Sequence, residues 1–282
     1  MPRVSVLMPI YNTQESHLRE AIESILAQTY GDFEFIILND SPDNTGLDAI
    51  VTSYSDERIV YSKNKKNIGI SASRNKLIDM SQGEYLAVMD HDDISLPERF
   101  AKQVSFLDEH ADVGVVGTWC KGFVHGQKWN TLTQHKDLER DLFFGCSIKH
   151  PSSMLRKSVL VAHGIRYEEE YSPSEDYRLW CCLIGKTHFA VVDEELFLYR
   201  DHDTRTSCNQ AKKMAQANIK IHEHVRAEYP ELWMEARVDS TICRKTKIFG
   251  IPFFYTYEKA NMQWCRLWDI IPLYSVKTRI HR

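Results

Sequence analysis

Three acidic residues directly follow an apolar run in the segment YLAVMDHDDISLP, residues 85–97. Asp90, Asp92 and Asp93 stand within four positions, although carboxylates this close repel one another. Mg²⁺ is usually held by one or two carboxylates together with the phosphates of a substrate, and a bound cation removes the repulsion. The competing interpretation is a solvated loop that caps the helix expected after Pro97.

Further charged residues lie at the ends of expected elements. Asp40 follows a second apolar run, and Arg74 lies near the start of an expected helix, where backbone amides and a guanidinium suit an anionic ligand. Glu175 and Asp176 open another expected helix, where acids ordinarily complement the helix dipole. The alternatives are a turn-forming residue for Asp40 and a solvated surface position for Arg74.

Hydrophobic periodicity indicates the elements that position these residues. Apolar runs bounded by polar residues predict buried strands, and apolar residues at i, i+3, i+4 and i+7 predict helices. The expected strands are residues 4–8, 33–38, 58–61, 85–89 and 189–192. The expected helices are about 16–26, 71–81 with Gly83 as its C-terminal stop, 97–107, 137–144, 174–184 and 211–229.

Strands that alternate with helices at this spacing predict a parallel sheet covered by helices. Ligands of such sheets bind beyond the carboxyl ends of the strands, so the polar residues after residues 8, 38 and 89 should share one rim. No G-x-G-x-x-G follows the first strand, and G-x-x-x-x-G-K-[ST] is absent from the sequence. These absences argue against a standard dinucleotide-binding protein and a P-loop NTPase.

Composition bounds the class of protein. A chain of 282 residues, 43% hydrophobic and 26% charged, can form one large α/β domain or two smaller ones. No apolar run reaches the length of a membrane span, and the first residues do not follow the signal-peptide pattern. Seven cysteines without a C-x-x-C predict neither a disulfide framework nor a thiolate zinc site. We therefore expect a cytoplasmic protein.

The charge is unevenly distributed. Of the 35 basic and 39 acidic residues, nine and three fall within 237–282, which leaves 26 and 36 in the rest of the chain. The acidic body argues against nucleic-acid binding. Within the basic segment, 247–254 and 266–274 both place basic and aromatic residues around an Ile-Pro step, a composition typical of contact with a membrane surface. A packing hairpin or an oligomer contact is the alternative.

The order of the motifs VSVLMPIYN, FEFIILND, NIGISASRN, GEYLAVMDHDD, SEDYRLW and LYRDHDTRTS resembles the family-2 glycosyltransferases with the GT-A fold. The resemblance covers about residues 3–207. It implies an α/β fold with a mostly parallel twisted sheet flanked by helices, in which a glycosyltransferase domain spans 1–236. Within it, a nucleotide-binding half over about 1–110 precedes an acceptor half over 111–236. Residues 237–282 form a basic aromatic tail.

The resemblance also implies roles for individual residues. Pro9, Tyr11 and Asp40 are expected to hold the uracil and ribose of a UDP-sugar, although the usual D-G-S-x-D loop is shortened here to DSPD. Arg74 and Asp90 are expected beside the nucleotide sugar.

The implied metal ligands are Asp90, Asp92 and His202, for Mn²⁺ or Mg²⁺, with imidazole favouring Mn²⁺. Asp176 is the implied catalytic base, and Asp93 is expected to be structural. The role of His150 stays open.

The function implied is metal-dependent, inverting transfer from a UDP-sugar to a glycan or lipid-linked acceptor in bacterial surface polysaccharide or lipopolysaccharide synthesis. The tail would contact the inner face of the membrane. A non-catalytic module that binds nucleotide sugars is the main alternative. A D-x-D-x-T phosphohydrolase is disfavoured because Ile94 stands in the place of the Thr. A sugar nucleotidyltransferase would carry a glycine-rich basic loop where MPIYNTQES stands.

Overall fold

The computed structural model describes residues 1–123, 126–200 and 209–238, together with the backbone of four later strands. The chain forms two compact units, Met1–His224 and Val225–Arg282. Within the described residues, no helix is both long and apolar enough to cross a bilayer. The functional division into a domain over 1–236 and a tail stays a prediction.

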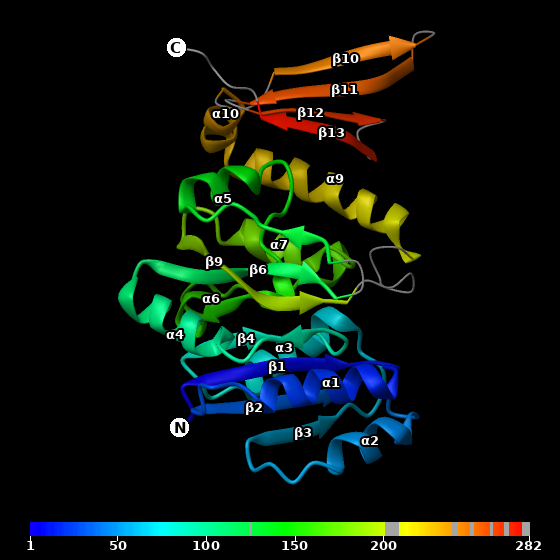
Figure 1. Cartoon of the computed structure of the whole chain (residues 1–282), viewed down its shortest axis with the longest axis vertical. Helices are drawn as coiled ribbons and strands as arrows, with labels where there is room; N and C mark the ends of the chain where they lie inside the picture. The colour runs from blue at the N-terminus through cyan, green and yellow to red at the C-terminus, as the bar shows by residue number, and fades with distance from the viewer. Residues whose placement is uncertain are drawn as a thin grey trace. The chain divides into compact units, whose positions relative to one another are not determined.

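The first unit is built on a nine-stranded sheet. Its strands are β1 (Val4–Ile10), β2 (Phe33–Asn39), β3 (Ile59–Lys63), β4 (Tyr85–Val88), β5 (Ile94–Ser95), β6 (Val113–Gly122), β7 (Lys128–Trp129), β8 (Met154–Arg156) and β9 (His188–Tyr199). The order is β3-β2-β1-β4-β8-β6-β9-β5, with β7 on β6. Its first four strands, β3, β2, β1 and β4, can be followed upward in Figure 1. From β3 to β4 the strands are parallel, whereas β8 is antiparallel to both of its neighbours. The predicted α/β class is confirmed.

Helices follow most of the parallel strands. They are α1 (Glu15–Leu26), α2 (Thr45–Thr52), α3 (Ile70–Met80), α4 (Arg99–Glu109), α5 (His135–Asp141), α6 (Lys157–His163), α7 (Glu175–Cys182), α9 (Ala211–Glu228) and α10 (Pro230–Val238). Two short 3-10 turns are also present: η1 (His150–Ser152) between α5 and β8, and η2 (Glu169–Tyr171) between α6 and α7. The six helices predicted from periodicity are all present with small shifts of their ends. Most elements of the first unit that the periodicity does not reveal are short: α2, α6, β5, β7 and β8. The ten-residue strand β6 and the helix α10 were also not predicted.

The core lies between the central strands and their helices. Every residue of β1 and of β2 is buried, as expected for strands that are covered on both faces. Helix α1 buries Leu18, Ala21, Ile22 and Ile25, the residues that the i, i+3, i+4, i+7 pattern selects. This packing holds the carboxyl ends of β1, β2 and β4, from which the polar loops begin.

A fully buried arginine holds the loop that follows β4. The Arg99 guanidinium donates to the Val88 carbonyl at 2.7 Å, the Ser153 carbonyl at 3.2 Å and Gln103 Oε1 at 3.0 Å. Burial lowers the pKa of Arg99 to about 9. The residue therefore ties the end of β4 to the chain that leaves η1.

The second unit contains a four-stranded antiparallel sheet in the order β10-β11-β12-β13. Its strands are β10 (Ile242–Ile248), β11 (Ile251–Lys259), β12 (Met262–Leu267) and β13 (Ile271–Lys277). Each strand pairs with the next along the chain, with one register shift between β10 and β11 and another between β12 and β13. The sheet is a meander of successive hairpins.

Gly83 does not serve as the helix stop that the sequence suggests. Helix α3 ends at Met80, Ser81 is its C-cap, and Gly83 is not among the glycines with positive φ. A Cβ at Gly83 would stand 2.7 Å from the Ser5 backbone nitrogen and 2.8 Å from the Val4 carbonyl carbon. The prediction of a helix stop is therefore wrong, and the glycine is needed because the entry to β4 passes close to β1.

We expect Gly83→Ala to lower the free energy of unfolding by about 1–3 kcal/mol, because the added Cβ would clash with backbone atoms of β1, which cannot move away as a flexible side chain could. Urea denaturation followed by circular dichroism measures the change. Gly31→Ala is the matched control, since a Cβ at Gly31 has nothing within 4 Å. Equal losses in the two variants would contradict the steric explanation.

Candidate active site

The polar residues after β1, β2 and β4 meet at one edge of the sheet, as predicted. The Asp40 amide donates to the Ile10 carbonyl at 2.9 Å, and the Asn12 amide donates to Ser41 Oγ at 2.9 Å. The Met89 amide donates to the Leu7 carbonyl at 3.2 Å, which brings the end of β4 alongside β1. These contacts define the rim on which the candidate residues lie.

Arg74, in the second turn of α3, connects two carboxylates from distant parts of the chain. Its Nη1 lies 2.7 Å from Glu175 Oε1 in α7, and its Nη2 lies 3.2 Å from Asp90 Oδ1 after β4. The Arg74 and Glu175 side chains are only 10% and 6% exposed. Burial by itself lowers the pKa of Arg74, but Asp90 and Glu175 outweigh it, so the net pKa is raised and the guanidinium stays charged.

A neutral pair lies beside Arg74. The Tyr167 ring centroid is 5.5 Å from the Arg74 guanidinium carbon, and the Tyr167 hydroxyl is 2.7 Å from His150 Nε2. Burial, with the nearby Arg74 charge, holds the pKa of His150 well below its usual range. Burial likewise raises the pKa of Tyr167. His150 is thus uncharged, and it holds the hydroxyl of the tyrosine whose ring contacts Arg74.

Asp176 stands in the first turn of α7 and is only partly buried. Its Oδ1 accepts a hydrogen bond from the Tyr177 amide at 2.7 Å. Burial, and then the neighbouring Glu175 charge, raise the pKa of Asp176 to about 6, although Arg74 acts in the opposite direction. A solvent-accessible carboxylate with a pKa near neutrality can accept a proton efficiently.

The acidic loop after β4 is tied to the end of β9 through Arg200. The Arg200 amide donates to Asp93 Oδ1 at 2.8 Å, and its Nε donates to the Asp92 carbonyl at 2.6 Å. The Arg200 guanidinium also pairs with Glu20 of α1. Asp93 is 2% exposed, and burial raises its pKa well above the usual value. These contacts are consistent with the structural role expected for Asp93, which stays a prediction.

The donor set after β4 fits a hard divalent cation. Asp90 and Asp92 are both partly exposed, and carboxylate oxygens are ligands suited to Mg²⁺ or Mn²⁺. In the part of the chain that the structure describes, no group of three His, Cys, Asp or Glu side chains is arranged to hold a metal. The predicted third ligand, His202, lies outside the described residues. Two carboxylates would leave positions for the phosphates of a substrate.

Asp40 holds the loop that leads into α3. Its Oδ1 accepts from Asn64 Nδ2 at 2.7 Å and from the Ile68 amide at 2.9 Å, and its Oδ2 accepts from the Gly69 amide at 3.0 Å. The residue is 4% exposed. Asp40 thereby sets the position at which α3, and with it Arg74, begins. Its contact with a nucleobase stays a prediction.

The two other residues expected at the nucleotide lie at the end of β1. Pro9 is buried within the strand, whereas Tyr11 just beyond it is 53% exposed. The Tyr11 ring is therefore accessible to a ligand. The adjacent Asn12 has a positive φ of 45°, which turns the chain away from the sheet at this point.

The sequence did not single out several residues that build this site. Asn64 and Tyr167 lack a recognisable motif, and the pairing of Glu175 with Arg74 joins residues 101 positions apart. Arg200 stands within the motif LYRDHDTRTS, so its position was indicated although its role was not. Each of these residues acts through a tertiary contact that periodicity cannot reveal.

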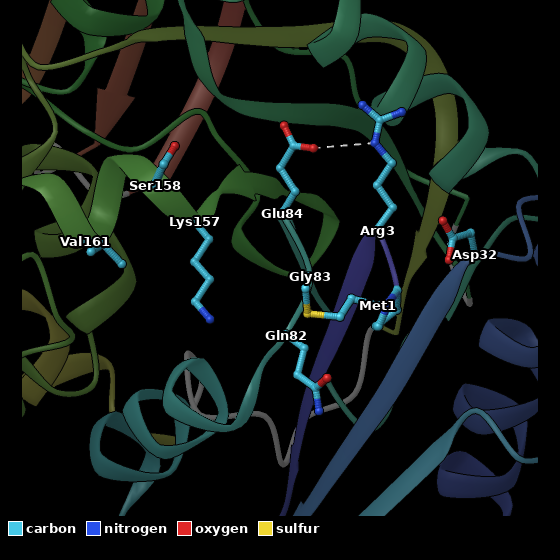
Figure 2. A pocket seen from close by; sticks show the side chains of 10 residues that line it. Met1, Arg3, Asp32, Gln82, Gly83, Glu84, Lys157, Ser158 and Val161 are labelled. Carbon is cyan, nitrogen blue, oxygen red and sulfur yellow. Dashed lines mark ion pairs between the residues drawn. The ribbon is translucent and has the colours of Figure 1, made fainter.

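The described residues also line a hollow at the opposite edge of the sheet (Figure 2). Three of its lining residues directly precede parallel strands: Arg3 precedes β1, Asp32 precedes β2 and Glu84 precedes β4. The Arg3 guanidinium pairs with the Glu84 carboxylate at 3.5 Å. The hollow lies at the amino-terminal ends of these parallel strands, whereas the candidate site lies at their carboxyl ends. The length of the strands therefore separates the two. The hollow contains none of the candidate residues.

Comparison with known sequences agrees with this geometry. The sequence model of glycosyl transferase family 2 matches residues 5–164. An uncharacterised glycosyltransferase of Methanocaldococcus jannaschii is 34% identical over 222 residues, which is 75% of each chain. The chain belongs to glycosyltransferase family 2. The minor teichoic acid biosynthesis protein GgaB of Bacillus subtilis is 31% identical over 226 residues, covering 74% of this chain and 24% of GgaB.

Two solved structures share the fold of this chain. S. aureus TarS in complex with UDP has a TM-score of 0.64 and 18% identity, over 83% of this chain and 70% of that of TarS. The mannosyltransferase PcManGT of Pyrobaculum calidifontis, in complex with GDP-mannose and Mn²⁺, has a TM-score of 0.56 and 16% identity, over 84% and 73%. The predicted GT-A fold is thereby confirmed.

We expect Asp40→Asn to lower the free energy of unfolding by about 1.5–3 kcal/mol, since hydrogen bonds to a charged acceptor are lost and the amide would place a donor against the donors around it. Thermal and urea unfolding at pH 7 measure the change. Asp43→Asn is the control, because Asp43 is exposed in the same loop. If both variants unfold like the wild type, Asp40 does not hold the start of α3.

Proposed function

We propose that this glycosyltransferase moves a sugar from a UDP-sugar to a hydroxyl group of a glycan or lipid-linked acceptor, with inversion at the anomeric carbon. The observation that carries the proposal is the contact of Arg74 with both Asp90 and Glu175, which sets a partly exposed carboxylate, Asp176, in the same charged cluster as the loop after β4. TarS, which shares the fold, has been solved with UDP and with UDP-GlcNAc, which supports a UDP-sugar as donor.

In the proposed reaction, the acceptor hydroxyl oxygen attacks C1 of the donor sugar from the face opposite the diphosphate. The new C1–O bond forms as the bond between C1 and the β-phosphate oxygen breaks, and UDP departs with that electron pair. The hydroxyl proton passes to the Asp176 carboxylate, because a sugar hydroxyl is a poor nucleophile without a base. One negative charge develops on the leaving diphosphate.

The donor side of the site must offset that charge. The Arg74 guanidinium is held by Glu175 on one side and directed toward Asp90 on the other, so it is prepared to meet a phosphate without reorganisation. Asp90, Asp92 and His202 are the residues that we propose to hold Mn²⁺ or Mg²⁺. When bound, the cation would supply Lewis-acid stabilisation of the diphosphate.

The acceptor class is proposed from the relatives and from the tail. GgaB is a minor teichoic acid biosynthesis protein, which supports a role in the synthesis of bacterial surface polymers. Lipopolysaccharide synthesis is proposed from the resemblance of the sequence motifs alone. We place the protein in the cytoplasm, with residues 237–282 in peripheral contact with the inner face of the membrane. The charge balance of this segment, nine basic against three acidic residues, supports that contact. A module that only binds nucleotide sugars would release no UDP, and an assay of UDP release separates the two.

We expect Asp176→Asn to lower the transfer rate by about 10²–10⁴-fold, the usual contribution of a general base, while affinity for the UDP-sugar persists. Glu175→Gln should cost less in rate, since Glu175 contacts Arg74 and not the proton that is transferred. Steady-state rates of UDP release and donor affinities of both variants are the measurements. Wild-type transfer by Asp176→Asn would show that the base lies elsewhere.

The pH profile provides an independent readout of the same residue. The base acts only when ionised, so the transfer rate should rise with pH through about 6, the pKa of Asp176, and then level off. This rise of the transfer rate with pH, the acidic limb of the profile, should disappear in Asp176→Asn. A limb that persists unchanged in the variant would assign it to another group.

We expect Asp92→Ala, or a chelator added to the wild type, to lower transfer by about 10²-fold or more without changing the melting temperature, because Asp92 lies on a partly exposed rim. Asp43→Ala, at an exposed position after β2, is the control and should transfer normally. Near-normal turnover by Asp92→Ala at saturating Mn²⁺ would contradict the metal site and favour the interpretation that the acidic loop only caps the following helix.

A further inference from the structure

The backbone register of the β10–β13 sheet sorts its residues onto two faces. Successive residues of a strand lie on opposite faces, and residues paired across strands lie on the same face. One row is Cys243, Tyr257, Trp264 and Ser275. The next row is Arg244, Thr256, Cys265 and Tyr274, and it therefore belongs to the other face.

The two faces differ sharply in charge. The face of Trp264, which we call the basic face, carries five basic and three aromatic residues and no acidic residue: Lys245, Lys247, Lys259, Arg266, Lys277, Tyr255, Tyr257 and Trp264. The opposite face carries one basic residue, Arg244, and one acidic residue, Glu258, among mostly apolar and small residues. The basic character of the segment is thus concentrated on one side of the sheet.

We propose that the basic face is a binding surface for the anionic headgroups of a lipid bilayer. Basic residues near an anionic leaflet gain from its surface potential, and tryptophan and tyrosine favour the level of the headgroups. The register places these residues together on one face of the sheet, so they can contact the same surface. The inference rests on the proposed membrane contact of residues 237–282 and assigns it to one face.

The faces offer a matched pair of substitutions, because Lys245 and Arg244 are neighbours in β10 on opposite faces. The assay is co-sedimentation of the full chain with vesicles of phosphatidylglycerol and phosphatidylcholine, with pure phosphatidylcholine as the neutral reference. We expect Lys245→Gln to weaken binding about 5-fold, the usual contribution of one basic residue near an anionic surface. Arg244→Gln should bind like the wild type.

Lys245→Gln combined with Lys259→Gln and Lys277→Gln should weaken binding by about 100-fold. Three outcomes would overturn the proposal: equal losses for Arg244→Gln and Lys245→Gln, wild-type binding by the triple variant, or no preference of the wild type for anionic vesicles. Tighter binding of the full chain to a 20-base-pair DNA duplex than to the vesicles would also overturn it and point to a nucleic-acid surface.

UDP release without vesicles, measured on the same samples, separates this proposal from the proposed reaction. None of the substituted residues belongs to the candidate active site, so the triple variant should release UDP at the wild-type rate. A protein that binds anionic vesicles through the basic face but releases no UDP would contradict the proposed function alone. Normal UDP release with no vesicle binding would contradict the basic face alone.

Discussion

The candidate site depends on one buried guanidinium. Arg74 reaches Glu175 at 2.7 Å and Asp90 at 3.2 Å, and it thereby joins helices α3 and α7 to the loop after β4. A buried cation is costly unless it is paired, and either carboxylate left alone in this place would also be costly. The three charges therefore constrain one another, and Asp176 takes its position from Glu175 as the adjacent residue of the same helical turn.

Neutral groups complete this constraint. His150 and Tyr167 are buried, bonded to each other at 2.7 Å, and kept uncharged by their surroundings. They support Arg74 through the Tyr167 ring without adding a further charge to the cluster. The start of α3 is fixed separately, by the three hydrogen bonds that the Asp40 carboxylate accepts. Different parts of the chain thus supply the charges that pair with Arg74, the ring that contacts it, and the hydrogen bonds that fix the start of its helix.

Much of the fold could be predicted from the sequence, because strands such as 4–8 and 33–38 are buried on both faces and helices such as 16–26 have a clear apolar stripe. Short elements escaped, since β5 and β7 contain two residues each and offer no period. For the site, the rim residues Asp40, Asp90 and Asp92 follow from strand ends. The roles of Tyr167, Asn64 and Arg200 could not be predicted, because each depends on a partner distant in sequence. Gly83 shows the same limit: its space is taken by β1, not by a helix end.

The link from Arg200 to the acidic loop makes the position of Asp92 depend on a distant strand. The Arg200 amide donates to Asp93 Oδ1, and the Arg200 guanidinium donates to the Asp92 carbonyl and pairs with Glu20 of α1. A displacement of the end of β9 would therefore be transmitted to the backbone of Asp92. The geometry of this carboxylate thus depends on how β9 and α1 pack, as well as on the loop that carries it.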